Sequence, residues 1–342
     1  MKQNDSIAFL LFAFAVFLLL AAAAPRPQAA ELPLVRIAHG AFNEKIAVLW
    51  VGAEQGLFRK HGVNVEVINI RNGPQTIAAL AAGEIQIAYT IPGTVLSAAA
   101  GGMDLAFFAG LVNRADGDFV AAANFRKGED LKGKKVGVQS IGGGVWSMTM
   151  LALEHLGLEP GRDKILLMIL GDQSVLTQAL TTGGIDAAYL SDTYSAALRD
   201  KGFHVLVDLG KADIVYQGLA LAAGRATLRQ NPQTIDALLR GVAESVAFIQ
   251  RPANKEAVLR SLAKNLRLKN AQDAESGYQP LQWLYSLDVT PNLKGVQNMH
   301  RLLALTNPKM RSVRSEDVID PAPVERLQKS AFYRDLVARE KR

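Results

Sequence analysis

Short apolar segments of strand character alternate with segments of helical character from Leu34 to about Leu221. The strand-like segments alternate in steps of two or are apolar throughout, and the segments between them repeat apolar residues at helical spacing. Such alternation predicts an α/β fold in which helices flank parallel or mixed sheets. The expected strands are 34–40, 63–70, 85–90, 105–112, 130–140, 164–170, 185–190 and 203–210. The expected helices are 43–62, 73–83, 94–102, 142–157, 172–184 and 193–202.

The pattern contains an internal repeat. The stretch LAAGEIQIAYTI at 80–91 matches LTTGGIDAAYLS at 180–191, and Tyr89 recurs 100 residues later as Tyr189. Each copy predicts a helix that ends in glycine, then a strand, then a polar loop that opens another helix. A chance recurrence of helix, glycine and strand within an α/β fold is the alternative. The shared tyrosine favours two similar lobes, each with its own sheet.

The character of the chain changes after Gly218, where strong amphipathic helices follow one another to the C-terminus. They predict a helical layer that returns to cover the first lobe. We expect the chain to cross between the lobes near 122–127 and near 213–218, and a few residues in two such crossings can serve as a hinge. The predicted domains are residues 31–124 with 218–342 as the first lobe, and residues 125–217 as the second lobe.

Residues 1–30 have the pattern of a secretory signal peptide. A short polar start carrying Lys2 precedes an unbroken apolar run from Ile7 to Ala24, and PRPQAAE follows. An uncleaved membrane anchor is the alternative, because about 18 apolar residues can just span a bilayer. The decay of the run into alanine and then proline favours cleavage, so we expect an exported protein of the bacterial periplasm.

Composition and motif spacing exclude several classes of function. The 342 residues allow about two domains, and the net charge of +6 is dispersed, with no stripe of basic and aromatic residues that would indicate a nucleic-acid partner. The absence of cysteine excludes disulfides, thiolate metal sites and a lipid-modified cysteine. The histidines have no HxxH or HExxH spacing, and no GxSxG motif occurs. We therefore expect a monomer with no catalytic site, no metal and no cofactor.

Several segments together resemble one family. AVLWVGAEQGLFRKHGVNVEV, TIAALAAGEIQIAY, DLKGKKVGV, LALEHLGLEP and LTTGGIDAAYLSD are similar to the nitrate/sulfonate/taurine substrate-binding proteins of ABC importers. Thiamine-pyrimidine-precursor binding proteins belong to the same broad family. The resemblance implies a two-lobed type II periplasmic binding protein fold, with two mixed sheets flanked by helices, a hinge, and a ligand closed between the lobes. It also implies an ABC permease and an ATPase as partners.

Two features bear on this resemblance. The family often has proline early in the first helix, and Val48 stands at the matching position, which leaves the shape of the first ligand loop open. Related pyrimidine synthase enzymes rely on a cysteine-rich motif, which this chain lacks.

The ligand is expected beyond the carboxyl ends of the strands, where open α/β sheets bind their ligands. The glycine loop 142–144 is the most informative part, because glycine lets backbone N–H groups approach a ligand and a helix N-terminus attracts anions. A turn without a ligand is the alternative. It is not a nucleotide fingerprint, since Ser147 replaces the third glycine of GxGxxG. The predicted ligand-binding residues are His39, Asn43, Asn72, Thr90, Gly93, Thr94, Gly143, Gly144, Val145, Trp146, Gln173, Ser191 and Asp192.

Some of these residues have a second interpretation. Trp146 either stacks on an organic ligand or packs in a core. His39 either donates to an anion or is an incidental loop residue. Asp192, like Asp172, would repel an anion or bind an ammonium or a ring N–H, or would simply cap a helix.

These observations favour a periplasmic substrate-binding protein that captures a small organic anion, of sulfonate or carboxylate type, between two lobes and delivers it to a permease. An exported enzyme on the same fold, of pyrimidine-precursor or desulfinating type, is one alternative. A ligand-sensing module that signals to a membrane receptor is another.

Overall fold

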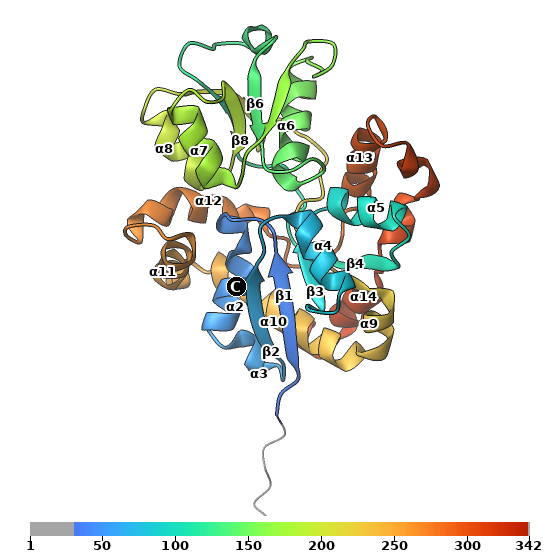
Figure 1. Cartoon of the computed structure of the whole chain (residues 1–342). Helices are drawn as coiled ribbons and strands as arrows, with labels where there is room; N and C mark the ends of the chain where they lie inside the picture. Colours follow the sequence, from blue (N-terminus) through green and yellow to red (C-terminus); the bar gives the residue numbers. More distant parts are fainter. Residues whose placement is uncertain (1–30, 341–342) are drawn as a thin grey trace, which may run out of the picture. The chain divides into compact units, whose positions relative to one another are not determined.

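Two five-stranded mixed sheets organise the computed structural model, which describes residues 31–340 (Figure 1). Both sheets belong to one compact unit that begins at Pro33. The predicted signal peptide, residues 1–30, lies outside the described residues. Within the described part of the chain, no helix combines the length and apolar character needed to cross a membrane.

The first sheet has the strand order β2-β1-β3-β10-β4. Strand β1 pairs in parallel with β2 and β3, and β10 pairs antiparallel with β3 and β4. The strands are β1 Leu34–His39, β2 Asn64–Asn69, β3 Ile87–Thr90, β4 Leu105–Gly110 and β10 Ala220–Gly224. The first four fall on segments that the hydrophobic pattern predicted as strands, and β10 on a strand-like run that follows Gly218.

The second sheet has the order β7-β6-β8-β5-β9. Its fourth strand, β5, is antiparallel to both of its neighbours, as β10 is in the first sheet. The strands are β5 Asp118–Ala121, β6 Lys135–Val138, β7 Leu166–Ile169, β8 Ala187–Leu190 and β9 His204–Asp208. Each sheet thus receives its antiparallel strand directly after the chain has crossed over from the other sheet.

The position of β5 corrects the predicted first crossing. The pattern placed that crossing near 122–127 and the end of the first segment at 124, yet β5 already belongs to the second sheet. The crossing is therefore 111–117, between β4 and β5. The four-residue strand follows the turn-forming sequence NRADG, and it is too short to show a clear period. The second crossing lies between β9 and β10 and contains the predicted 213–218.

Helices flank both sheets. Those of the strand-alternating region are α2 Ala47–Glu54, α3 Leu57–Lys60, α4 Gly73–Ala81, α5 Pro92–Ala100, α6 Gly144–His155, α7 Gln173–Thr181 and α8 Asp192–Arg199. The expected helix 43–62 is divided into a 3-10 turn η1 Glu44–Ile46, α2 and α3. The break falls at Gly56, whose φ of 69° is left-handed and cannot continue a helix.

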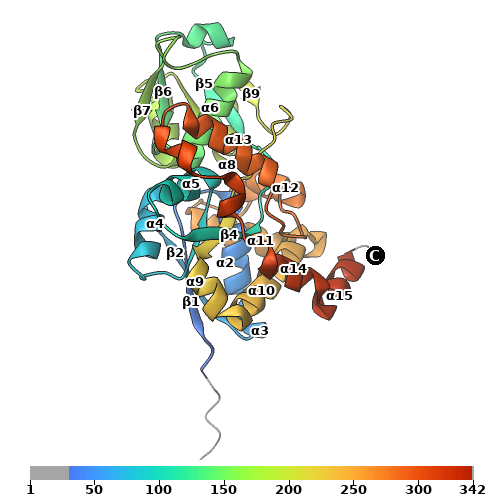
Figure 2. The same cartoon turned by 90° about the vertical axis from the view of Figure 1, so that its right-hand side faces the viewer.

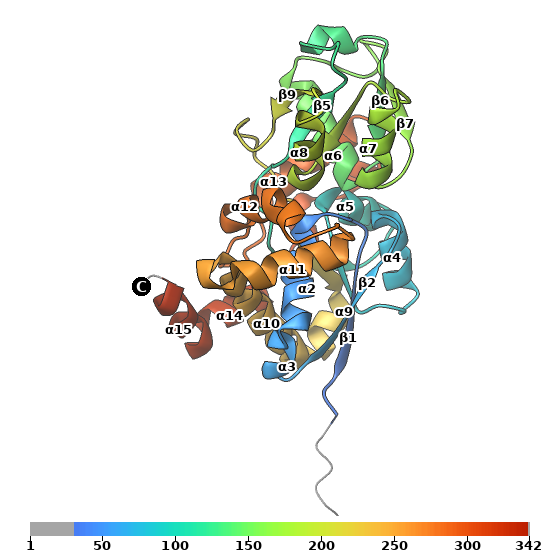
Figure 3. The ribbon, with the colours of Figure 1, turned by 90° about the vertical axis from the view of Figure 1, so that its left-hand side faces the viewer.

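The C-terminal helices cover the first lobe, as predicted. They are α9 Arg225–Gln230, α10 Pro232–Gln250, α11 Lys255–Leu266, α12 Glu275–Leu284, α13 Leu293–Ala304, α14 Ala322–Lys329 and α15 Ala331–Glu340. Helix α10 packs on α2 and α3, α11 packs on α2, and α13 packs on α5 (Figures 2 and 3). The layer also reaches the second lobe, because α12 contacts α8.

Candidate functional site

A cavity lies at the carboxyl ends of the strands, between residues of the two sheets. It encloses about 60 Å³, which is room for a few water molecules or a small ligand group. Its walls come from the segments that follow β1, β2, β3, β6 and β7, from Tyr89 in β3 and Tyr189 in β8, and from both crossing segments. The lining residues are Gly40, Ala41, Phe42, Asn43, Lys45, Gly73, Tyr89, Thr90, Ile91, Thr94, Val112, Asp116, Gln139, Ser140, Gly143, Gly144, Val145, Met148, Gln173, Tyr189, Tyr216, Gly218 and Leu219.

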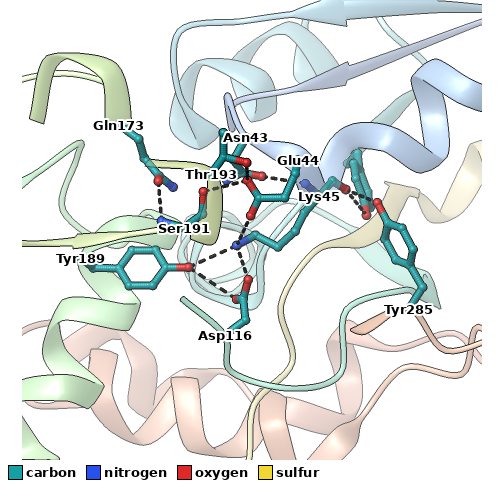
Figure 4. Close-up of polar contacts among 10 residues, drawn as sticks. Asn43, Glu44, Lys45, Asp116, Gln173, Tyr189, Ser191, Thr193 and Tyr285 are labelled. Carbon is teal, nitrogen blue, oxygen red and sulfur yellow. Dashed lines mark hydrogen bonds and ion pairs between the residues drawn. The ribbon is translucent and has the colours of Figure 1, made fainter. Parts of the chain in front are cut away.

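Lys45 is the basic residue of this lining, and its ammonium group is held from three directions (Figure 4). Its Nζ lies 2.6 Å from Asp116 Oδ2, donates to the Tyr189 hydroxyl at 3.1 Å, and lies 3.9 Å from Glu44 Oε1. Asp116 comes from the first crossing and Tyr189 from β8. The lysine of the first lobe is therefore bonded to both the crossing and the second lobe.

Glu44 makes a second connection between the lobes (Figure 4). Its Oε2 accepts hydrogen bonds from Ser191 Oγ at 2.8 Å and from Thr193 Oγ1 at 2.9 Å. Both hydroxyls belong to the start of α8. Glu44 is completely buried, and its other oxygen, Oε1, has no hydrogen-bond partner.

The backbone at the start of η1 is fixed by polar side chains. Asn43 Oδ1 accepts from the Lys45 N–H at 3.1 Å and so caps η1. The Lys45 carbonyl accepts from the hydroxyls of Tyr285 at 2.8 Å and Tyr89 at 3.2 Å. These bonds hold the adjacent Glu44 and Lys45 so that their side chains project toward the second lobe.

Burial and the neighbouring charges shift the protonation of this cluster. Burial opposes the charge on Lys45, but Asp116, Tyr189 and Glu44 outweigh it and raise the pKa of Lys45 well above its usual value. Burial raises the pKa of Glu44, against the pull of Lys45. Burial, with the charges of Glu44 and Asp116, raises the pKa of Asp192 to about 7. The lysine is thus charged at neutral pH, whereas burial favours the protonated forms of Glu44 and Asp192.

The same acids also have the spacing of a metal site. Among the described residues, Glu44, Asp116 and Asp192 bring carboxylate oxygens within 4.8 Å of one another. The Lys45 ammonium already lies among them, 2.6 Å from Asp116. A metal ion would have to approach this positive charge, so the arrangement fits a buried ion-pair network better than a metal centre.

A different part of the cavity suits an anion. Helices α5 and α6 begin at its wall, and no side chain caps either N-terminus. The first N–H groups of a helix have no acceptor within the helix and carry partial positive charge. Thr94, in the first turn of α5, is 5% exposed, and its hydroxyl has no hydrogen-bond partner. Gly144 and Val145, in the first turn of α6, line the same cavity.

The predicted site residues divide into two groups. Seven of them line the cavity: Asn43, Thr90, Thr94, Gly143, Gly144, Val145 and Gln173. Six do not line it: His39, Asn72, Gly93, Trp146, Ser191 and Asp192.

Four residues of the second group position the chain around the cavity without lining it. Asn72 caps α4, and the backbone of Gly93 approaches Gly142 of the other lobe so closely that a Cβ would lie 2.6 Å from its carbonyl oxygen. Ser191 donates its N–H to Gln173 Oε1 at 2.7 Å. Asp192 lies beside the acids rather than in the lining.

The side chains of His39 and Trp146 do not line the cavity, and His39 ends strand β1 rather than lying in a loop. Trp146 is 2% exposed and belongs to the hydrophobic core that includes the second sheet, so its ring does not reach the cavity. His39 is buried against Trp50, with ring centroids 5.9 Å apart, and donates to the Ala41 carbonyl. Burial lowers the pKa of His39 to about 4, so its ring offers no positive charge at neutral pH.

Sequence reasoning missed Glu44, Lys45 and Asp116. The pattern treated the first two as the opening of a helix and the third as part of a loop. One signal was present: two charged residues directly follow the loop HGAFN and precede a strongly apolar helix, where a solvated charge is out of place. The pattern marks Tyr89 and Tyr189 only as the tyrosine shared by the two copies of the repeat.

Comparison with known proteins agrees with this two-lobed binding architecture. Residues 43–255 match the family model described as NMT1/THI5 like. The chain belongs to the NMT1/THI5-like family. The Brucella abortus (strain 2308) protein named "Putative binding protein BAB2_1146" is 26% identical over 245 residues, which cover 69% of this chain and 73% of that protein.

Solved structures show the fold. The periplasmic aliphatic sulphonate binding protein SsuA from Escherichia coli has a TM-score of 0.65 at 21% identity, covering 84% of this chain and 99% of that one. The periplasmic nitrate-binding protein NrtA from Synechocystis PCC 6803 has a TM-score of 0.68 at 17% identity, covering 91% and 90%. The chain therefore has the two-lobed periplasmic binding protein fold, as predicted.

A more distant neighbour with the same fold was solved with an organic sulfinic acid bound. DSZB, solved as a cysteine-to-serine mutant in complex with biphenyl-2-sulfinic acid, has a TM-score of 0.57 at 14% identity, covering 90% of this chain and 100% of that one. The residue replaced in that structure is a cysteine, and the present chain has none. The relatives above are named as binding proteins, which favours binding without turnover.

Proposed function

We propose that this protein is the substrate-binding component of an ABC importer, which captures a small organic anion between its two lobes and delivers it to a permease. The observation that carries the proposal is the convergence of two uncapped helix N-termini, α5 and α6, with the unpartnered Thr94 hydroxyl and the charged Lys45 on one cavity. Export to the periplasm, through the predicted signal peptide, is part of the same proposal.

The donor groups account for an anionic head group. N–H groups at helix N-termini bind sulfonates and carboxylates without a basic side chain, and each is worth about 0.3–1 kcal/mol when exposed or up to about 2 when partly buried. Lys45 adds an ammonium donor, whose charge is balanced by Asp116 at 2.6 Å. Its short contacts to Asp116 and Tyr189 engage two of its three donors.

The rest of the wall accounts for an organic ligand. Ile91, Val145, Met148, Val112 and Leu219 contribute apolar surface to the cavity. Such a wall stabilises an apolar group by about 25 cal/mol for each Å² that it removes from water. An alkyl or aryl group next to the anionic head would bury this surface, and a bare inorganic ion would leave it without a partner.

Capture follows from the place of the cavity between the lobes. The walls from the first sheet and from the second sheet both contribute donors, so a ligand makes its full set of contacts only when the lobes are together. A ligand shifts the equilibrium toward closure by the difference between its contacts in the two states. The crossings at 111–117 and 209–219 are the segments that would absorb the motion.

A thermal-shift screen of the purified chain tests the proposal. Sulfonates, aromatic and aliphatic carboxylates, nitrate, bicarbonate, pyrimidines and amines would be added separately. A ligand at about 100 times its dissociation constant stabilises a protein by about 2.7 kcal/mol, which a shift in melting temperature reveals. We expect a shift with one organic sulfonate or carboxylate class. A shift confined to amines or pyrimidines would reject the anion, and product formation from the bound compound would establish an enzyme.

Thr94→Val tests the site itself. The variant keeps the shape of the side chain and removes the unpartnered hydroxyl, so we expect the affinity for the anion to fall by about 1.5–3 kcal/mol, roughly 10- to 150-fold. Thr181→Val, on the exposed surface of α7, is the matched control and should bind normally. Calorimetric titration of both variants with the ligand found in the screen measures the difference.

A further inference from the structure

Glu44 and Asp192 belong to different lobes, have carboxylate oxygens within 4.8 Å of each other, and each has a buried oxygen without a hydrogen-bond partner. Glu44 lies in η1 of the first lobe, and Asp192 is the first residue of α8 in the second lobe. Glu44 Oε1 and Asp192 Oδ2 are both buried and have no hydrogen-bond partner. The carboxylate oxygens of these two residues and Asp116 lie within 4.8 Å of one another.

The nearby donors do not reach the unpartnered oxygens. Ser191 and Thr193 donate to the other oxygen of Glu44, and the Lys45 ammonium makes its short bonds to Asp116 and Tyr189. Lys45 Nζ is 3.9 Å from Glu44 Oε1, which is beyond hydrogen-bond distance. Three carboxyl groups thus face one ammonium, and if all were ionised the cluster would hold a buried charge of about −2, an arrangement that proteins avoid by protonating an acid.

A single proton on the Glu44–Asp192 pair accounts for both features. It removes one negative charge, and it supplies the missing donor, since a protonated carboxyl donates to a carboxylate. Paired carboxyl groups that share a site behave in this way, with one pKa strongly raised.

We propose that Glu44 and Asp192 share one proton between the two lobes, and that bringing the lobes together on a ligand takes this proton up. The second half rests on the proposed function, whereas the first half concerns the described arrangement of the chain alone. The shared proton would make ligand affinity depend on pH through two residues, Glu44 and Asp192, that do not line the cavity.

The surroundings of the pair come from several elements of both lobes. Their charged or titratable groups are Lys45 in η1, Asp116 in the first crossing, Asp118 in β5 with its ion-pair partner Arg199 in α8, Tyr189 in β8, Asp172 at the start of α7, Tyr194 in α8, and Glu275 and Tyr278 in α12. Glu275 is paired with Lys255, at 2.8 Å. Asp116 and Asp118 favour protonation of Asp192, and Lys45 opposes it.

The direction of the pH effect follows from linkage. In the described arrangement the pKa of Asp192 is raised to about 7 by burial and by the charges of Glu44 and Asp116, while a solvated aspartate titrates near 3.9. Between these two values the arrangement with the lobes together binds more protons than the separated one. Ligand affinity should therefore be highest below about pH 4, fall by up to about tenfold per pH unit toward pH 7, and level off above it.

A carboxyl ¹³C NMR titration of the whole chain tests the shared proton, first alone and then with any ligand that the screen supplies. We expect one aspartate carboxyl that titrates near pH 7 in at least one of these samples. Asp192→Asn should abolish that signal. Glu44→Gln should return it toward the ordinary aspartate range, because the charge is removed while Ser191 and Thr193 keep an acceptor. Asp200→Asn, exposed at the end of the same helix, should leave it unchanged.

Two results would overturn the proposal. The first is that every aspartate carboxyl of the native chain titrates below pH 5 in all samples. The second is that calorimetry in buffers of different ionisation enthalpy finds no proton uptake on ligand binding at pH 5.5, when the titrating carboxyl appears only in the bound form. A carboxyl that titrates near pH 7 in a protein for which the screen finds no ligand would keep the shared proton and reject the proposed function.

Discussion

The two copies of the internal repeat fold alike but present different chemistry. In the first, α4 is followed by Gly83 with φ 76°, and β3 leads into α5; in the second, α7 is followed by Gly183 with φ 75°, and β8 leads into α8. Both strands are buried throughout. The backbone of one copy is therefore a fair guide to the other.

The difference begins at the first residues of the following helices. Helix α5 starts with Pro92, Gly93 and Thr94, which leave its N-terminus uncharged and add a hydroxyl. Helix α8 starts with Asp192 and Thr193, of which one carries a carboxyl and the other donates to Glu44. The first copy thus suits an anion, and the second joins the lobes through acids. The repeated sequence therefore determines where the next helix begins, in both copies. Two or three side chains at that start determine which group its N-terminus binds.

The paired tyrosines show the same division. Tyr89 donates to the backbone carbonyl of Lys45, whereas Tyr189 bonds to the Lys45 ammonium and lies 3.4 Å from Asp116 Oδ1. Equivalent positions in the two strands therefore bind opposite ends of the same residue. Substitutions of Lys45 and of each tyrosine therefore measure how much each copy contributes to the free energy of unfolding.

Lys45→Met should have the largest effect. It keeps the length of the side chain but leaves Asp116 buried without its partner, and such a loss costs about 3–5 kcal/mol of unfolding free energy. Chemical denaturation measures the change. Lys264→Met, which breaks an exposed pair with Glu54, is the control and should cost less than about 1 kcal/mol. Equal effects of the two variants would mean that the buried network contributes no more than a surface pair.

The tyrosines should differ from each other. Tyr189→Phe removes hydrogen bonds to charged groups and should cost about 1.5–3 kcal/mol, while Tyr89→Phe removes one bond to a neutral carbonyl and should cost about 0.5–1.5 kcal/mol. The same denaturation experiment compares them. A larger loss for Tyr89→Phe would reverse the assignment of the stronger network to the second copy.

The glycines should behave identically. Gly83→Ala and Gly183→Ala each place a side chain in a left-handed conformation, and nothing lies within 4 Å of either added Cβ. Backbone strain alone then applies, and each variant should lose about 1–2 kcal/mol. Losses of unfolding free energy that differ by more than about 0.5 kcal/mol would show that the same backbone geometry has a different energetic cost in the two copies.

Much of the fold could be predicted from the chain because hydrophobic periods report it directly. The alternation of strands and helices, the two lobes and the C-terminal layer all follow from apolar spacing, glycine positions and the repeat. Strand β5 was not predicted, because four residues between turn-forming segments are too few to show a hydrophobic period.

The site was only partly predictable. Residues at helix starts, such as Thr94 and Gly144, follow from the rule that loops at strand ends bind ligands. Lys45 and Asp116 do not, because their pairing joins positions 71 residues apart and depends on where the crossing brings the chain. A tryptophan beside a glycine loop is equally compatible with a core and with a cavity, and only the direction of the side chain separates the two.

A crystal structure of the protein with the ligand from the screen would show directly whether the cavity between the lobes binds an organic anion. We expect an anionic group against the Thr94 hydroxyl and the N–H groups at the start of α6, within hydrogen-bond distance of Lys45. A ligand that places a positive group against Asp116, or that binds outside this cavity, would contradict it.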